Sequence, residues 1–270
     1  MTDRSYVRAV LLAGFLVHAL AAALAAEDDC PPGAAHAAAG KVALLGEGGM
    51  LILEDGQQVR LSAIAVPAGE STYGEEARAG LERLLLGRAV ALAHVGSPDR
   101  YARLPAHVHV GQGDDRVWVQ EWLIARGLAR VQSFEDNRAC ASRLLAREDA
   151  ARGARLGLWA SPHFAVRAAG EPEALRRFLD TFQLVEGEVI SVGAAGRRVY
   201  LNFGRRWKTD FTGVIAANDL DMFAAAGILP LKLPNRRVRL RGWILEQDGP
   251  MMVLDHPEQI ELIDDGDKHD

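Results

Sequence analysis

Apolar and polar positions along the first half of the chain predict short strands joined by tight turns. Residues 50–53 form an apolar stretch, and Glu54-Asp55-Gly56 follows as a turn signal of the Asp-Gly kind. Val59-Arg60-Leu61 then resumes a strand with an arginine between two apolar neighbours. Pro67 ends the run, because proline cannot donate a backbone hydrogen bond within a sheet. We therefore predict a strand, a turn and a second strand here.

Helical spacing appears first in residues 71–86. Ala77, Leu81, Leu84 and Leu85 recur at intervals that place them on one helix face, and Gly87 is suited to end the helix. Further strands are expected at 41–45, 89–95 and 103–110, and further helices at 118–126 and 137–153. The first half is therefore predicted to be a short β-barrel with helices inserted and appended.

The second half repeats the β-rich pattern without a clear internal repeat. Strands are expected at 187–192, 198–203, 236–245 and 251–254, with one short helix at 219–227. Short strands with one helix in this length suggest a small barrel of the OB type. The fold class is thus mostly β with α (α+β), with a first domain at 41–162, a linker helix at 163–182, a β-rich accessory domain at 183–262 and an acidic tail at 263–270.

The N-terminal pattern is typical of a signal peptide over residues 1–25, followed by a linker at 26–40. Arg4 and Arg8 precede an apolar run, and Ala23-Leu24-Ala25 has the form of a cleavage site. The run is short for a bilayer span, which needs about 20 residues. We expect an exported protein, periplasmic or secreted, with no stable membrane insertion after processing. The alternative is an uncleaved membrane anchor.

Export gives meaning to the two cysteines, Cys30 and Cys140. Exported proteins with two cysteines usually pair them. A disulfide would tie the N-terminal arm to the first domain. The alternative is two free thiols.

Composition is that of a globular protein, with a mildly negative net charge of −5. This balance argues against bulk electrostatic capture of nucleic acid. The net charge does not exclude a local basic groove.

Five motifs, in order, give the first domain a family resemblance. They are residues 59–61, 64–67, 99–103, 127–131 and 155–159 (VRL, IAVP, DRYAR, GLARV and RLGLW). Over residues 41–159 the chain resembles the thermonuclease (staphylococcal-nuclease-like) family. The resemblance implies an OB-fold barrel with a calcium-dependent phosphodiesterase site that cleaves nucleic acid.

The resemblance places the family's two arginines on Arg60 and Arg103. A planar guanidinium suits bidentate contact with a phosphate. Both residues are therefore predicted to bind phosphate, and they are the candidate catalytic positions. The motif around Arg103 reads DRYAR where DRYGR is usual.

The family's acidic positions fall on Gly49, Ala65 and Ala68. Calcium needs oxygen ligands, which glycine and alanine side chains cannot supply. We therefore expect no bound cofactor, although the family would use Ca²⁺, and we predict a degenerate nuclease. The alternative is an active nuclease whose relocated metal site uses Glu47.

Two further patterns suggest binding sites. Arg237, Arg239 and Arg241 share one strand face, and with Trp207 they could form a nucleic-acid-binding groove of the OB type. The alternative is a solvated face balanced by nearby carboxylates. His107 and His109 share a strand face without a third metal ligand, and are interpreted as ordinary barrel-surface histidines.

Three functions follow from these patterns. The preferred one is binding of nucleic acid or another phosphate-bearing ligand at Arg60 and Arg103. The second is metal-dependent hydrolysis at a rearranged site. The third is docking to envelope proteins.

Overall fold

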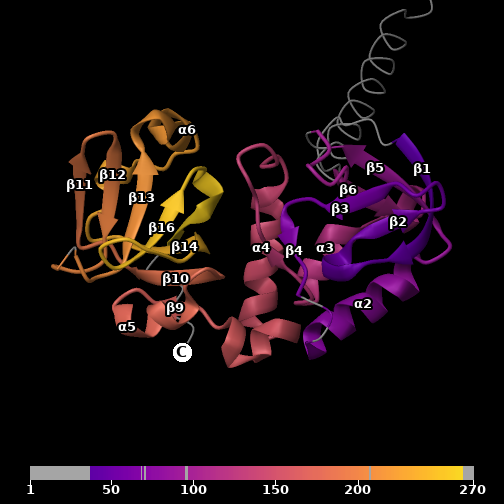
Figure 1. The fold of residues 1–270 in the computed structure, drawn as a ribbon, viewed down its shortest axis with the longest axis horizontal. Coiled ribbons are helices and arrows are strands. Elements are labelled where there is room, and N and C mark those ends of the chain that lie inside the picture. The colour runs from indigo at the N-terminus through magenta and orange to yellow at the C-terminus, as the bar shows by residue number, and fades with distance from the viewer. Residues whose placement is uncertain (1–36, 68, 70, 95–96, 207, 264–270) are drawn as a thin grey trace, which may run out of the picture.

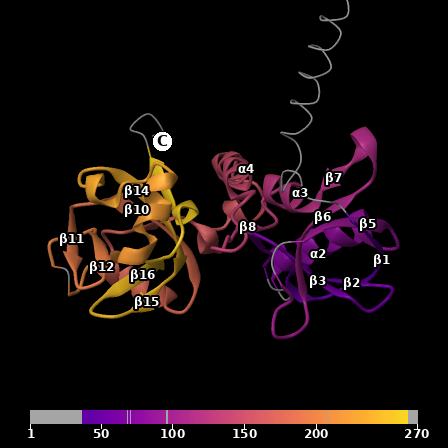
Figure 2. The same cartoon turned by 90° about the horizontal axis from the view of Figure 1, so that it is seen from above.

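The computed structural model describes residues 37–67, 69, 71–94, 97–206 and 208–263. The expected signal peptide, Cys30, Ala68, Trp207 and the acidic tail lie outside the described residues. The described residues form two domains with helix α4 (Ala141–Gly153) between them in both views (Figures 1 and 2). No helix among these residues is long and apolar enough to cross a bilayer.

The first domain is built on a closed barrel of five strands. Strand β3 pairs with both β2 and β6, and β5 joins β6 to β1, so that the sheet returns on itself. This closed OB-like barrel confirms the predicted fold class. Its strands are β1 (Ala37–Leu45), β2 (Leu51–Leu53), β3 (Gln58–Leu61), β5 (Ala89–His94) and β6 (Leu104–Val110).

Alternation along the strands decides which side chains face the barrel core. Leu51, Leu53, Val59 and Leu61 are buried, whereas Arg60 between them is only half-buried. Successive side chains on a strand point to opposite faces, so Arg60 faces away from the core. The predicted opening hairpin is confirmed by the antiparallel pairing of β2 and β3.

Helix α2 (Thr72–Leu85) covers the barrel with the predicted apolar face, since Ala77, Leu81 and Leu85 are buried. The Ser71 side chain caps it by accepting a hydrogen bond from the Gly74 backbone N–H. The domain is completed by β4 (Ile64–Ala65), β7 (Val117–Trp118), α3 (Val119–Ala125), β8 (Arg130–Val131) and α4. Its 3₁₀ turns are Glu47–Gly49, Gly113–Asp115, Gly157–Ala160 and Pro162–Phe164.

The segment between the domains is not the single helix that was predicted for 163–182. It contains β9 (Arg167–Ala168), α5 (Pro172–Leu175) and a 3₁₀ turn at Arg176–Phe178. Strand β9 pairs with β10 of the second domain, and Asp180 turns the chain with a left-handed φ of 57°. Sheet pairing and this turn therefore interrupt the helical run.

The second domain has the predicted β-rich content, arranged as two sheets on one apolar core. One sheet has the order β17-β14-β10-β9, and the other β11-β12-β13-β16-β15. The strands are β10 (Phe182–Glu188), β11 (Ser191–Ala195), β12 (Arg198–Asn202), β13 (Thr212–Ala216), β14 (Arg237–Trp243), β15 (Leu245–Glu246), β16 (Pro250–Leu254) and β17 (Ile260–Ile263). Helix α6 (Leu220–Ala225) and 3₁₀ turns at Ala217–Asp219, Pro230–Lys232 and Pro257–Gln259 complete it.

Candidate functional site

The fold brings Arg60 and Arg103 together. Arg60 lies on β3, which runs parallel to β6, and Arg103 immediately precedes β6. Both side chains line one open cavity of about 720 Å³. The other lining residues are Asp99, Phe134, Glu135, Asp136 and Asp255. The predicted pair of arginines is therefore one surface feature, named the arginine cavity below.

Arg103 is held by a carboxylate of its own motif. Its guanidinium Nη2 lies 2.7 Å from Oδ2 of Asp99, and its backbone N–H and that of Tyr101 donate to Oδ1. Desolvation pushes the pKa of Asp99 upward, but these hydrogen bonds outweigh it and hold that pKa below its ordinary value. Arg103 is thus largely neutralised before any ligand arrives.

Arg60 is differently placed. Its Cζ lies 5.9 Å from the centre of the Phe134 ring, and it forms no ion pair with any described residue. A guanidinium over an aromatic face keeps its hydrogen-bond donors available at its edges. Of the two arginines, Arg60 is therefore better placed to donate hydrogen bonds to a phosphate.

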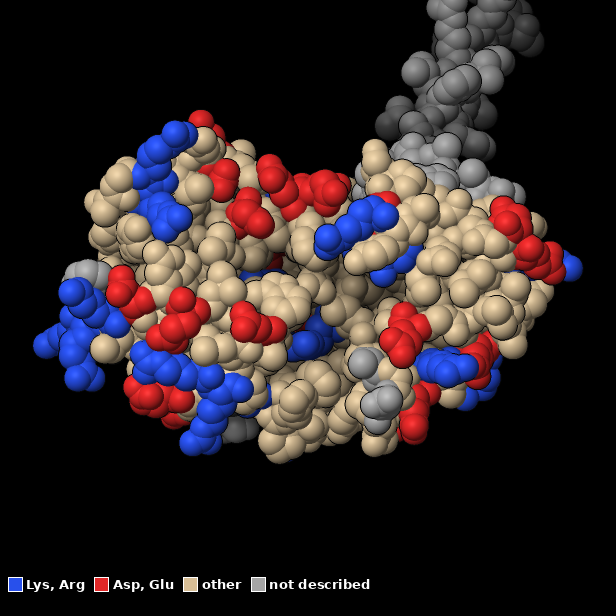
Figure 3. All heavy atoms as spheres, in the orientation of Figure 1, with Lys and Arg blue, Asp and Glu red and all other residues tan. Residues whose placement is uncertain are grey.

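The charge of the arginine cavity opposes a polyanion. Its two arginines face four carboxylates, those of Asp99, Glu135, Asp136 and Asp255. Figure 3 shows acidic and basic side chains interspersed over both domains, without one continuous basic surface on this face. A single phosphate group at Arg60 suits this cavity better than a nucleic-acid backbone crossing it.

Gly49, the position predicted for the family's first metal ligand, is closed by packing. Gly49 is buried with a left-handed φ of 75°. A Cβ at this position would meet Cγ2 of Val66 at 2.9 Å and side-chain carbons of Leu61 and Leu81 at 3.4 Å. An aspartate would therefore be both strained and crowded here.

The other acidic positions supply no ligand among the described residues. Ala65 pairs with Arg130 between β4 and β8, and Ala68 lies outside the described part. No group of three or more His, Cys, Asp or Glu side chains in the described residues could hold a metal ion. Glu47 is exposed and does not line the arginine cavity, so nothing described supports a relocated site there.

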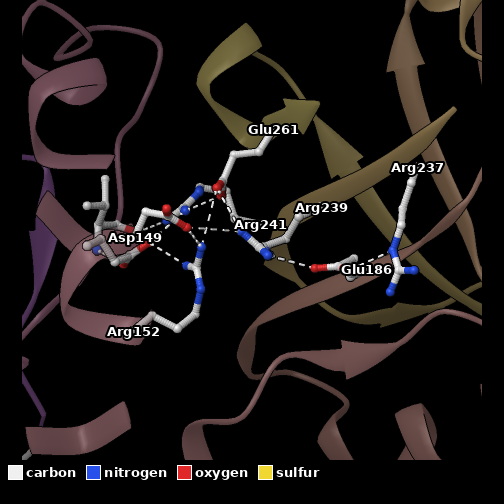
Figure 4. A network of polar contacts seen from close by, with 9 residues as sticks. Asp149, Arg152, Glu186, Arg237, Arg239, Arg241 and Glu261 are labelled. Atoms are coloured by element: carbon white, nitrogen blue, oxygen red, sulfur yellow. Dashed lines mark hydrogen bonds and ion pairs between the residues drawn. The ribbon is translucent and has the colours of Figure 1, made fainter. Parts of the chain in front are cut away.

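The predicted nucleic-acid surface on β14 is wrong for Arg241. Its side chain is only 1% exposed. Its Nη2 nitrogen lies 2.7 Å from Oε2 of Glu148 and also forms an ion pair with Glu261. Burial favours a neutral guanidine, but these carboxylates outweigh it and raise the pKa of Arg241. Arg239 and Arg237 share the carboxylate of Glu186 (Figure 4). The strand's arginines are thus paired within the protein.

The same network joins the two domains. Glu148 is fully buried on α4, and its second oxygen accepts the Val131 backbone N–H at 2.7 Å. Arg241 from the second domain donates to the Val131 carbonyl at 3.0 Å. Outside this cluster, Arg138 forms two hydrogen bonds with the carboxylate of Glu258. The second domain is therefore fixed in an orientation that brings Asp255 to the arginine cavity.

Two other sequence interpretations change or stay open. His107 and His109 are buried against the Trp118 ring, not on the barrel surface, because β6 packs under β7 and α3. Cys140 is buried and is not a free thiol. Cys30 lies outside the described residues, so its pairing with Cys140 stays a prediction.

Sequence reasoning missed most of the residues that line the arginine cavity. Phe134, Glu135 and Asp136 lie between β8 and α4, in a polar loop that carries no motif. Asp255 follows β16 of the other domain, 152 residues after Arg103 and 195 residues after Arg60. No local pattern could have joined it to them.

Comparison with known proteins agrees with the barrel. The family model described as "Staphylococcal nuclease homologue" matches residues 58–161. Protein ParB of Escherichia coli is 32% identical over 133 residues, which are 47% of this chain and 71% of that protein. The chain belongs to the staphylococcal nuclease homologue family.

Two plant proteins are also similar to part of this family member. An uncharacterized 38.1 kDa protein of Capnoides sempervirens is 33% identical over 111 residues, 41% of this chain and 30% of that protein. A probable staphylococcal-like nuclease of Oryza sativa subsp. japonica is 30% identical over 110 residues, 41% of this chain and 31% of that protein. The chain thus spans about a third of the length of these two relatives.

Proposed function

We propose that this protein binds a phosphate-bearing ligand, such as the terminal phosphate of an oligonucleotide, at Arg60 and Arg103, and that it has lost the calcium-dependent hydrolysis of its family. The observation that carries the proposal is that Arg60 lines the arginine cavity without an ion-pair partner among the described residues, whereas Val66 packs against Gly49. Arg60 is thus available to contact a phosphate, whereas Val66 occupies the space that an aspartate side chain at position 49 would need.

The loss of hydrolysis follows from charge. In a phosphodiester reaction a metal ion and cationic side chains stabilise negative charge that grows in the transition state. Here Asp99 already neutralises Arg103, and three more carboxylates add negative charge. Removal of one stabilising donor costs about 10²–10³-fold in rate. The remaining Arg60 would bind a phosphate without activating it strongly.

The decisive experiment compares binding and cleavage in one preparation. A fluorescent single-stranded oligonucleotide with a 5′-phosphate is titrated with the protein, and the same oligonucleotide is incubated with Ca²⁺ and analysed for products. We expect phosphate-dependent binding that Arg60→Ala abolishes, and no cleavage above the buffer rate. Arg126→Ala is the matched control, since it removes an exposed arginine that does not line the cavity.

Two results would contradict the proposal. Calcium-dependent cleavage that Arg60→Ala abolishes would restore the active-nuclease alternative with a relocated site. Equal affinity of the unmodified protein and Arg60→Ala would remove the phosphate site. The envelope-docking alternative gains no support from the described residues and stays a prediction.

A further inference from the structure

Three side chains form a hydrogen-bonded line where the two domains meet. Oγ of Ser133 lies 2.8 Å from Nε2 of His256, and Nδ1 of the same ring lies 2.5 Å from Oδ1 of Asp255. Ser133 follows β8 of the first domain, whereas Asp255 and His256 follow β16 of the second. The line therefore exists only because the domains dock.

The order of the three groups fixes the direction of the hydrogen bonds. A carboxylate can only accept, so Asp255 accepts a hydrogen bond from Nδ1–H of His256, and the proton stays on the ring. In the neutral ring Nε2 is then the acceptor, and the Ser133 hydroxyl is the donor. A serine hydroxyl that donates to a histidine, itself oriented by a carboxylate, is the arrangement that activates serine as a nucleophile.

Ser133 and His256 open onto a cavity of their own. It has a volume of about 230 Å³ and is distinct from the arginine cavity, although Phe134 and Asp255 contribute to both. Apolar side chains form most of its wall: Phe134, Phe182, Trp243, Leu245 and Val253. The volume and the walls suit a small apolar acyl group.

Gln132 is the candidate hydrogen-bond donor for a developing oxyanion. Gln132 lines the same cavity, and its side-chain amide donates to none of the described residues. Glutamine amides can stabilise the oxyanion of a tetrahedral intermediate. The backbone of Gln132 is fixed by donation to the Ala63 carbonyl at 2.9 Å.

We propose that Ser133, His256 and Asp255 form a hydrolytic site for carboxylic esters with small apolar acyl groups. Ser133 Oγ bonds to the ester carbonyl carbon while its proton passes to Nε2 of His256. The bond from that carbon to the alkoxy oxygen breaks, and the alcohol leaves with the same proton. Water then gives a proton to His256 and its oxygen to the acyl carbon, and Ser133 departs with the proton to release the acid.

Domain docking does not rest on the Ser133–His256 hydrogen bond alone, because the Arg241–Glu148 and Arg138–Glu258 ion pairs also join the domains. A purely structural role for the Ser133 hydrogen bond would leave its oxygen no more reactive than that of any other serine. Chemical reactivity of Ser133 therefore separates the two roles.

The test is covalent labelling of the full chain with a small alkyl fluorophosphonate, followed by intact mass and peptide mapping. We expect one adduct on Ser133, and at least tenfold slower labelling in His256→Gln. Arg126→Ala is the matched control: it removes an exposed side chain that lines neither cavity and joins no domain contact, and it should label at the rate of the unmodified protein. Hydrolysis of p-nitrophenyl acetate above the buffer rate should be lost in Ser133→Ala and kept in Ser161→Ala.

The labelling of the unmodified protein decides the matter even if a variant fails to fold. Absence of an adduct on Ser133, under conditions that label a reference serine esterase completely, overturns the proposal. An adduct whose rate is equal in His256→Gln and the unmodified protein does the same, because the histidine would then have no part in the reaction. These outcomes are independent of oligonucleotide binding at Arg60.

Discussion

Replacement of Arg241 by methionine tests the central energetic inference, that one buried ion pair sets the position of the second domain. Met removes the guanidinium and keeps a similar unbranched length. It leaves Glu148 fully buried with the Val131 N–H and with Arg152, whose nearest nitrogen is 3.7 Å away. Glu261 keeps Arg239 at 3.1 Å.

The magnitude follows from this partial compensation. Breaking a buried ion pair by removal of one partner typically costs about 3–5 kcal/mol, because the remaining charge is left without its counterion. Arg152 and Arg239 relieve part of the cost, so we expect about 3 kcal/mol for Arg241→Met. Glu148→Gln keeps one acceptor for Val131 and leaves Arg241 paired with Glu261, so the smaller range for a charged hydrogen bond applies, about 1.5–3 kcal/mol.

The assay is urea denaturation of both single variants and the double variant, followed by the signal of each domain. Because the two residues touch, the cycle should show a coupling free energy near the upper end of the usual range, about 2–3 kcal/mol. Arg147→Met is the matched control on α4, the helix that carries Glu148: its partner Glu121 lies within the first domain, and the variant should cost no more than about 1 kcal/mol. A loss below 1 kcal/mol in Arg241→Met, or additive single variants, would refute the reasoning.

Three further predictions concern single positions. Gly49→Asp should lower the free energy of unfolding by about 1–3 kcal/mol because its Cβ would crowd Val66, and calorimetry should detect no gain of calcium binding. Ala102 has a left-handed φ of 59°, which strains an alanine. Ala102→Gly should therefore raise the free energy of unfolding by up to about 1 kcal/mol, and the melting temperature with it; an unchanged or lower melting temperature would show that the strain is absent. Burial favours a higher pKa for Glu261, but Arg241 and Arg239 outweigh burial and lower that pKa. The ionised carboxylate therefore stabilises the fold fully above the unfolded pKa of about 4.3. This stabilisation is lost as the pH falls through the folded pKa. The stability difference between the unmodified protein and Glu261→Gln should be constant above about pH 5 and shrink at pH 3.5; a constant difference at both would contradict this.

Local pattern predicted the main strands and helices of the first domain. Alternation around Arg60, the turn at 54–56 and the helical spacing of Ala77, Leu81 and Leu85 predicted elements that the structure confirms. These features depend on neighbours within a few residues, which a sequence displays directly. The same reasoning failed at 163–182, where a helical pattern was overridden by pairing of β9 with β10. Propensity over a few turns is weaker than a sheet contact.

By itself, the sequence predicted the barrel and its family, assigned the family's two arginines to Arg60 and Arg103, and placed glycine or alanine at the predicted acidic positions. Only the tertiary structure decided what surrounds them. It showed Val66 against Gly49, placed Asp255 with Arg60, buried Arg241 on Glu148, and aligned Ser133 with His256. Each of these contacts joins residues that are not neighbours in the chain, and most depend on domain docking. The energies that select them come from burial and charge pairing between distant segments, which no local pattern records.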